Sequence, residues 1–255
     1  MSRSVAELID AWEQTLVASA ELVSDLSETE WRLATCCPGW DVHDHVAHLG
    51  GLESELAGRP LSGHVAPDLS HLHNPFAVHM EAAVDERRAW SHERVLQELR
   101  DVTAERAAQL RGAGLALDTM VTGPMGRQSK AQGFLGIRAF DAWTHEQDIR
   151  AALDRPGNLD SPAARIACER LIGSLAHMAR SAGLTDQQIV AVEVTGPVTM
   201  SGVSGEGEPV ATLRMDTHAF TRLGCGRVGP GDAAVQVVGD ADVARAFLGA
   251  MAITP

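Results

Sequence analysis

The stretch RAFDAWTHEQDIRAAL carries residues whose types and spacing could bind a metal ion. Asp141 and His145 are four residues apart, so on a helix their side chains lie one turn apart on one face. Arg138 and Asp148 fall on the same face, where a helix that packs into a core ordinarily carries apolar residues. A carboxylate and an imidazole in this arrangement can hold one divalent cation between them.

A third ligand must come from another segment, and VHDHVAHLGGLE is the best supplier. Its apolar stripe predicts a helix capped by Asp41, with His45 and His48 on one flank of the stripe. His48 lies about 60° around the helix from His45 and can point into a bundle. His43 lies on the other side of the helix, where we expect it to be solvated.

One carboxylate and two imidazoles suit Zn²⁺ or a similar divalent ion, and three protein ligands leave positions open for water or substrate. Asp148 is expected to bind the ion or to orient His145. Arg138 is placed to hold a substrate carboxylate through two hydrogen bonds. The spacing also fits a buried ion-pair network without metal, in which Arg138 pairs with Asp141 and Asp148. From spacing alone both interpretations stay open.

The helices that must position these residues are visible as apolar periodicity in the first part of the chain. We expect four main helices connected as in a bundle, over residues 4–26, 42–57, 76–111 and 138–153. The third is expected to be interrupted near Trp90 and Ser91. Residues 57–75 have the composition of a loop, and residues 119–134 look irregular.

The composition changes after DRPGNLDSP. A helix is expected over residues 161–182, then strands at QIVAVEVTG, VATLRMD and AAVQVVGD, and helices at THAFTRLGCG and ADVARAFLGAMA. The fold class is therefore α followed by α+β. We expect a helical-bundle domain over residues 1–157 and a smaller α+β domain over residues 158–255.

Charge and composition exclude several classes of partner. A formal net charge of −13 argues against nucleic acid and anionic membrane, and no window approaches the length of an apolar membrane span. Acidic residues stand where a signal peptide would have its apolar centre, so we expect a cytoplasmic protein. We expect it to be a monomer or a homodimer. The cysteines are expected to be reduced and to serve as small buried hydrophobic residues: Cys36, Cys37, Cys168 and Cys225.

CPGWDVHDHVAHLGGLE, followed later by RAFDAWTHEQDIRAAL, resembles the actinobacterial mycothiol-dependent maleylpyruvate isomerase family. The tail from ATLRMDTHAF onward looks like the sterol-carrier-protein-like domain that many members append. The resemblance implies a DinB-like four-helix bundle followed by that α+β domain. It also implies that His48, Asp141 and His145 bind a divalent metal. Many relatives have glutamate at the acidic position, so Asp141 is a shorter variant.

The resemblance further implies mycothiol as a thiol cosubstrate. A thiol that binds a divalent cation is deprotonated and becomes a nucleophile, here toward a small electrophilic substrate in cis–trans isomerisation or S-transfer. Candidate arginines for substrate carboxylates and developing enolate charge are Arg138, Arg222 and Arg227. Arg150 and Asp148 are the candidates for cofactor binding. Surface salt bridging is the alternative for each arginine.

Three further residue sets leave alternatives open. Glu53 could act as a base near the metal or be an exposed helix carboxylate. The loop histidines His64, His71 and His73 could form a lid or simply be solvated. A non-catalytic metal-containing protein, whose second domain binds an apolar ligand, is the alternative to an enzyme. The response of thiol-dependent turnover to His48→Ala separates the two functions.

Overall fold

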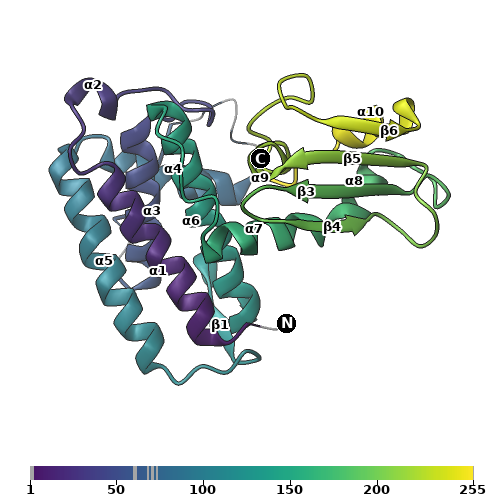
Figure 1. Ribbon diagram of the computed structural model, residues 1–255. Coiled ribbons are helices and arrows are strands. Elements are labelled where there is room, and N and C mark those ends of the chain that lie inside the picture. Colours follow the sequence, from purple (N-terminus) through teal and green to yellow (C-terminus); the bar gives the residue numbers. More distant parts are fainter. Residues whose placement is uncertain (1–2, 60–61, 68, 70–71, 73, 255) are drawn as a thin grey trace. The chain divides into compact units, whose positions relative to one another are not determined.

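A computed structural model describes residues 3–59, 62–67, 69, 72 and 74–254. Among these residues the chain divides into two compact units, the first ending at Gly157 and the second beginning at Asn158. The first unit is helical and the second combines helices with a sheet (Figure 1). The fold class expected from the sequence is confirmed.

The first unit contains these elements in chain order: α1 (Val5–Leu22), α2 (Glu28–Trp31), α3 (Val42–Leu56), α4 (Pro75–Arg87), α5 (His92–Gly112), β1 (Met120–Thr122), the 3₁₀ helix η1 (Pro124–Gly126), β2 (Gln128–Lys130) and α6 (Ala131–Leu153). Long helices form a bundle in which α1 packs against α6 and α5, and α3 packs against α5 and α4 (Figure 1). Large apolar side chains fill the space between them, among them Trp12, Leu16, Leu49, Leu99, Leu135 and Trp143.

Side chains at the helix starts fix where these helices begin. Asp41 caps α3 by accepting a hydrogen bond at 2.9 Å from the backbone N–H of Asp44, whose carboxylate in turn bonds the N–H of Asp41. Ser91 caps α5 and separates it from α4, so the expected interruption of the third helix is confirmed. The segment expected to be irregular is instead a short antiparallel hairpin, in which Met120 pairs with Lys130.

Helix α3 has no solvated face over most of its length. Residues 42–54 are all buried, because α4, α5, α6 and α2 surround the helix. Gly50 and Gly51 permit the close approach of its neighbours. A Cβ at Gly51 would lie 3.1 Å from the Arg87 guanidinium, and one at Gly50 would lie 3.5 Å from the Leu99 backbone nitrogen. The face of α3 opposite the apolar stripe is therefore part of the interior.

The second unit contains α7 (Pro162–Ile172), α8 (Leu175–Ser181), β3 (Val190–Thr195), β4 (Met200–Val203), β5 (Ala211–Asp216), α9 (Thr217–Gly224), β6 (Gln236–Gly239) and α10 (Ala241–Leu248). The sheet has the order β4-β3-β5-β6, with β3 and β5 parallel and the other pairs antiparallel. Alternate residues of β3 are buried, as period-two patterning requires of a half-buried strand. The sequence analysis missed β4, and the helix expected over residues 161–182 is divided at Gly173 and Ser174.

Across the described part of the chain, no helix combines the length and the apolar character needed to cross a bilayer.

Candidate metal centre

Helices α3 and α6 bring together the three ligands predicted from the sequence. Nε2 of His48 lies 3.5 Å from Oδ2 of Asp141, and Nε2 of His145 lies 3.7 Å from Oδ1 of the same carboxylate. One ligand atom from each of the three residues lies within 4.8 Å of the others. Two imidazole nitrogens and a carboxylate oxygen therefore converge from two segments that are far apart in the sequence. We call this group the His48 cluster.

His48 is prepared to act as a neutral ligand. Its side chain is 5% exposed, and its Nε2 is a buried atom that has no hydrogen-bond partner among the described residues. Burial is the main influence that lowers the pKa of His48, and the nearby His145 and Arg138 lower it further, against the opposing effect of Asp141. A buried nitrogen without a partner is costly, and a metal ion in the cluster would satisfy it.

Asp141 is held as an anion by a buried arginine one turn earlier on α6. Burial would raise the pKa of Asp141, but the positive charge of Arg138 and the neighbouring histidines outweigh it and hold the pKa well below its usual range. Nη1 of Arg138 donates to Oδ2 of Asp141 at 2.8 Å. The carboxylate is thus charged at neutral pH, as a metal ligand must be.

Arg138 itself is anchored by Glu53 of α3. Its Nη2 and Nε donate to Oε1 of Glu53 at 2.6 Å and 3.0 Å, and Trp12 donates to the same oxygen at 3.0 Å. Glu53 is 1% exposed, so the expectation of an exposed helix carboxylate is wrong. The sequence carried a signal, because Glu53 follows Leu49 by four residues on the apolar stripe of α3. Nε, Nη1 and Nη2 of Arg138 therefore all donate hydrogen bonds to carboxylates of the protein.

The expectation that His43 is solvated is also wrong. Its side chain is buried, with Nε2 3.0 Å from the carbonyl oxygen of Arg87 and Nδ1 2.8 Å from Nδ1 of His92. The reason is the position of α3 inside the bundle, where the face that carries His43 packs toward the junction between α4 and α5. This histidine supports the packing of the helices and is separate from the His48 cluster.

Asp148 and Trp40 complete the surroundings of His145. Nδ1 of His145 lies 3.3 Å from Oδ2 of Asp148, which is the orienting contact expected for that carboxylate. The half-buried indole of Trp40 lies over the histidines, with ring centroids 5.1 Å from His48 and 5.7 Å from His145. Trp40 is fixed by donating to Glu81 at 2.8 Å. The indole therefore forms an apolar wall beside both imidazoles.

The sequence analysis did not assign Cys36 and Cys37 to this region. Cys36 is exposed and Cys37 is partly exposed, so the expectation that they serve as small buried hydrophobic residues is wrong. Their Sγ atoms donate to Asp148, from Cys36 to Oδ1 at 3.1 Å and from Cys37 to Oδ2 at 3.5 Å. The loop before α3 carries them, and its irregular backbone gives no spacing signal. The same expectation is confirmed for Cys168 and Cys225, which are buried.

The remaining predicted arginines have other surroundings. Nε of Arg150 donates to Glu146 at 2.8 Å, and its Nη1 donates to the carbonyl oxygen of Arg155 at 3.2 Å, near the end of α6. Arg222 lies on α9 and is buried, while Arg227 donates to the carbonyl oxygen of Cys225 at 2.8 Å. Both belong to the second unit, and their role in substrate binding stays a prediction.

The histidine-bearing loop is only partly described. His64 is exposed and its Nε2 lies 2.7 Å from Oδ2 of Asp85 on α4. His71 and His73 lie outside the described residues, so a lid formed by these side chains stays a prediction.

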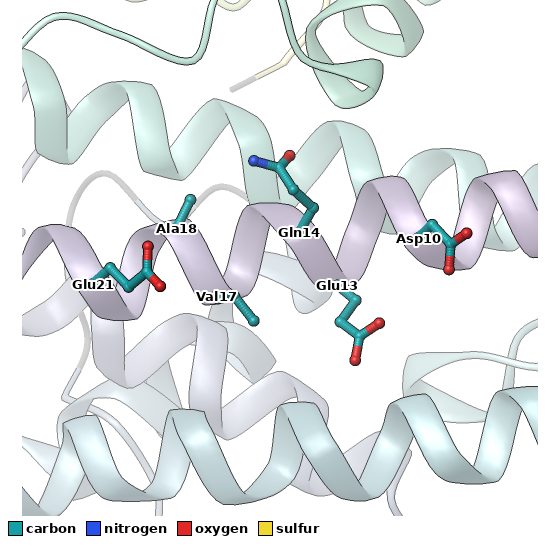
Figure 2. Close-up of a pocket in the computed structure, with 6 residues that line it drawn as sticks. All are labelled: Asp10, Glu13, Gln14, Val17, Ala18 and Glu21. Carbon is teal, nitrogen blue, oxygen red and sulfur yellow. The ribbon is translucent and has the colours of Figure 1, made fainter.

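Two surface depressions are lined by no residue of the His48 cluster. One is lined by residues of α1 alone, and Figure 2 shows their side chains along that helix: Asp10, Glu13, Gln14, Val17, Ala18 and Glu21. Asp10 and Glu13 pair with Arg111 of α5. Another, in the second unit, is lined in part by the charged residues Arg180, Asp186 and Glu206. Neither includes a histidine or a cysteine.

Comparisons with known proteins match this chain to one family and to two solved structures. The family model described as the mycothiol maleylpyruvate isomerase N-terminal domain matches residues 12–150, a span that includes the whole His48 cluster. Two solved structures share the fold: a mycothiol-dependent maleylpyruvate isomerase, 15% identical, and a histidine-to-alanine mutant of that isomerase, 14% identical. Each comparison covers 92% of this chain and 94% of the other, with a TM-score of 0.61. No curated protein matches the chain.

Proposed function

Because the chain belongs to the mycothiol-dependent maleylpyruvate isomerase family, we propose that it is a metal- and mycothiol-dependent enzyme that acts on a small electrophile. The observation that carries this proposal is the convergence of His48, Asp141 and His145, whose ligand atoms lie within 4.8 Å of one another. Three protein ligands leave room for a further ligand, as in catalytic metal sites and unlike closed structural ones.

The donor set fits a divalent ion of borderline hardness, and Zn²⁺ is the ion we propose. The cluster offers the unpartnered Nε2 of His48, the anionic carboxylate of Asp141 and a nitrogen of His145. When bound, the ion would lower the pKa of a coordinated thiol and so supply a thiolate at neutral pH.

The chain itself contributes charge, orientation and partial exclusion of water. Arg138 keeps Asp141 ionised and fixes the direction of its carboxylate, and Glu53 compensates the charge of Arg138 inside the bundle. Asp148 orients the ring of His145. Trp40 covers the imidazole side of the centre. These contacts pre-organise the ligands before any ion or substrate arrives.

In the reaction class that we propose, mycothiol would supply a sulfur nucleophile that adds to a cis double bond, permits rotation about the resulting single bond, and leaves to give the trans isomer. An S-transferase would use the same centre, but the new C–S bond would persist and a leaving group or proton transfer would complete the reaction. We propose isomerisation as the activity to test first, because the family model and both structural relatives carry the name of an isomerase.

The test is metal content together with thiol-dependent turnover. Purified protein is analysed for bound metal by mass spectrometry and assayed for maleylpyruvate isomerisation with and without mycothiol. We expect about one or more equivalents of divalent metal, activity that requires mycothiol, and loss of that activity in His48→Ala and Asp141→Ala. His177→Ala is the matched control, because His177 is an exposed histidine on α8. Negligible metal in the folded wild type, or turnover that is unaffected by His48→Ala, would overturn the proposal.

A further inference from the structure

Next to the His48 cluster lies a second group of potential metal ligands. Cys37, His45, His145 and Asp148 each place a ligand atom within 4.8 Å of the others. Cys37 comes from the loop before α3, His45 from α3, and the other two from α6. This group joins three segments, and only His145 also belongs to the His48 cluster.

Three of the six separations between the ligand atoms match the edges of a metal-centred tetrahedron. Bond lengths of about 2.0–2.1 Å to nitrogen, 2.0–2.2 Å to oxygen and 2.3 Å to sulfur give edges of about 3.3–3.6 Å at tetrahedral angles. Nδ1 of His45 lies 3.2 Å from Nδ1 of His145, which in turn lies 3.3 Å from Oδ2 of Asp148. That oxygen lies 3.5 Å from Sγ of Cys37. Three successive edges therefore have nearly the required length.

Contacts at one nitrogen of each histidine ring direct the other nitrogen toward this group. Oγ1 of Thr35 lies 2.9 Å from Nε2 of His45, so the opposite nitrogen of that ring faces His145. Nε2 of His145 faces Asp141, and its Nδ1 faces Asp148. His145 thus faces the His48 cluster with Nε2 and the second group with Nδ1. His45 and Asp148 are buried, whereas Cys37 is partly exposed and provides a side from which an ion can enter.

We propose that Cys37, His45, His145 and Asp148 form a second divalent-metal site with sulfur, nitrogen and oxygen ligands, suited to Zn²⁺. Four protein ligands close the coordination sphere, as in structural zinc sites. Binding releases the thiol proton of Cys37 to solvent, and the resulting thiolate joins the ion. When the His48 cluster is filled as well, His145 also releases its ring N–H proton to solvent, because each of its two nitrogens then binds one ion. The site ties the loop before α3 to α6. The site shares His145 with the His48 cluster, but its thiolate and His45 belong to it alone, so loss of Cys37 tests it separately from the proposed reaction.

Co²⁺ is the probe that distinguishes the two sites, because only a thiolate ligand gives an intense near-ultraviolet sulfur-to-cobalt charge-transfer band. Metal-free protein is titrated with Co²⁺ under reducing conditions. We expect the band in the wild type, its loss in Cys37→Ser, and its retention in Cys36→Ser, the matched control at the neighbouring thiol. We also expect the band to persist in His48→Ala and Asp141→Asn, in which the first cluster is dismantled. Added Zn²⁺ should remove the band by displacement.

The variants separate the two sites through residues that belong to only one of them. A folded wild type, verified by circular dichroism, that binds Co²⁺ without a thiolate band would overturn the second site and leave the His48 cluster intact. A band that survives Cys37→Ser would also overturn it. A band that persists in a protein without mycothiol-dependent turnover would support the second site while the proposed function fails.

Discussion

Buried Arg138 and partly exposed Asp141 form an ion pair at 2.8 Å, and the carboxylate oxygen of this pair also lies 3.5 Å from Nε2 of His48. The ion-pair network and the metal centre, which the sequence left as alternatives, therefore share an atom. The ion pair fixes the carboxylate and keeps it ionised, while His48 contacts the same oxygen and His145 lies 3.7 Å from the other oxygen. One arrangement serves both the stability of the bundle and the chemistry that we propose for it.

Replacement of Arg138 should destabilise the bundle strongly. Arg138→Ala removes the guanidinium that donates to Glu53 and Asp141 and leaves Arg106, 3.8 Å away, as the remaining cation beside the buried Glu53. We therefore expect the free energy of unfolding to fall by about 3 kcal/mol. Urea denaturation monitored by circular dichroism measures this loss. The exposed Arg127 provides a control, since Arg127→Ala should change the free energy by no more than about 0.5 kcal/mol. Equal effects of the two substitutions would show that the buried pair is unimportant.

The tryptophan over the histidines should report metal binding. The centroid of Trp40 lies within 5.7 Å of the rings of His48 and His145, so Co²⁺ bound there should quench its fluorescence. We expect quenching on addition of Co²⁺ to metal-free wild type, and most of it should disappear in Trp40→Phe. Trp90→Phe, at an indole that packs against Arg94 instead, should keep the quenching. The idea fails if Trp40→Phe is quenched as fully as the wild type.

The four cysteines should divide into two reactivity classes. In metal-free native protein we expect iodoacetamide to label Cys36 and Cys37, which are exposed and partly exposed. Burial raises the pKa of the Cys168 thiol to about 12, so this residue should react only after unfolding, together with the buried Cys225. Peptide mass spectrometry after labelling with and without urea identifies which cysteines have reacted. Native labelling of Cys168 would contradict the described packing of α7.

The ion pair of Asp85 should make stability depend on pH in acid. The hydrogen bond from His64 is the largest influence that lowers the pKa of Asp85, and Arg88 lowers it further, against the effect of partial burial. The pKa of Asp85 is lower in the folded state than in the unfolded chain. The contribution of ionised Asp85 to the free energy of unfolding is therefore complete above the unfolded-state pKa, near 3.8. It is lost as the pH falls through the folded-state value.

Asp85→Asn should therefore lower the free energy of unfolding by about 0.5–1 kcal/mol at pH 7 and low salt. The difference from the wild type should shrink toward zero as the pH falls below about 4. Denaturation curves of the wild type and Asp85→Asn between pH 7 and acid test whether the difference in the free energy of unfolding shrinks in this direction. A difference that is constant with pH would show that Asp85 acts through packing rather than charge.

The sequence predicted the parts of the fold that depend on local periodicity and capping. Asp41 marks the start of α3, and Ser91 marks the break between α4 and α5. The pair Asp141 and His145 could be placed on one face from their spacing, because a helix fixes that geometry by itself. The prediction of a ligand on α3 needed only the position of His48 relative to the apolar stripe of that helix.

Features that depend on tertiary packing were missed or placed wrongly. A helical wheel assumes one solvated face, but α4 and α5 cover the far side of α3, and so His43 is buried. Glu53 is stabilised by Arg138, which comes from a helix far along the chain. Cys37 stands in a loop, and its contact with Asp148 follows from no spacing rule. The division at Gly173 reflects a single C-capping residue inside an otherwise helical pattern.

The origin of the three proposed ligands on separate helices would make metal supply a determinant of how much of the protein survives in the cell. Unfolding separates His48 on α3 from Asp141 and His145 on α6, so an ion held by these side chains would bind the native chain in preference to the unfolded one. Each tenfold rise in free metal above the dissociation constant then adds about 1.4 kcal/mol to stability. Under metal starvation, proteases that remove unfolded chains would reduce the abundance of the protein as well as its activity.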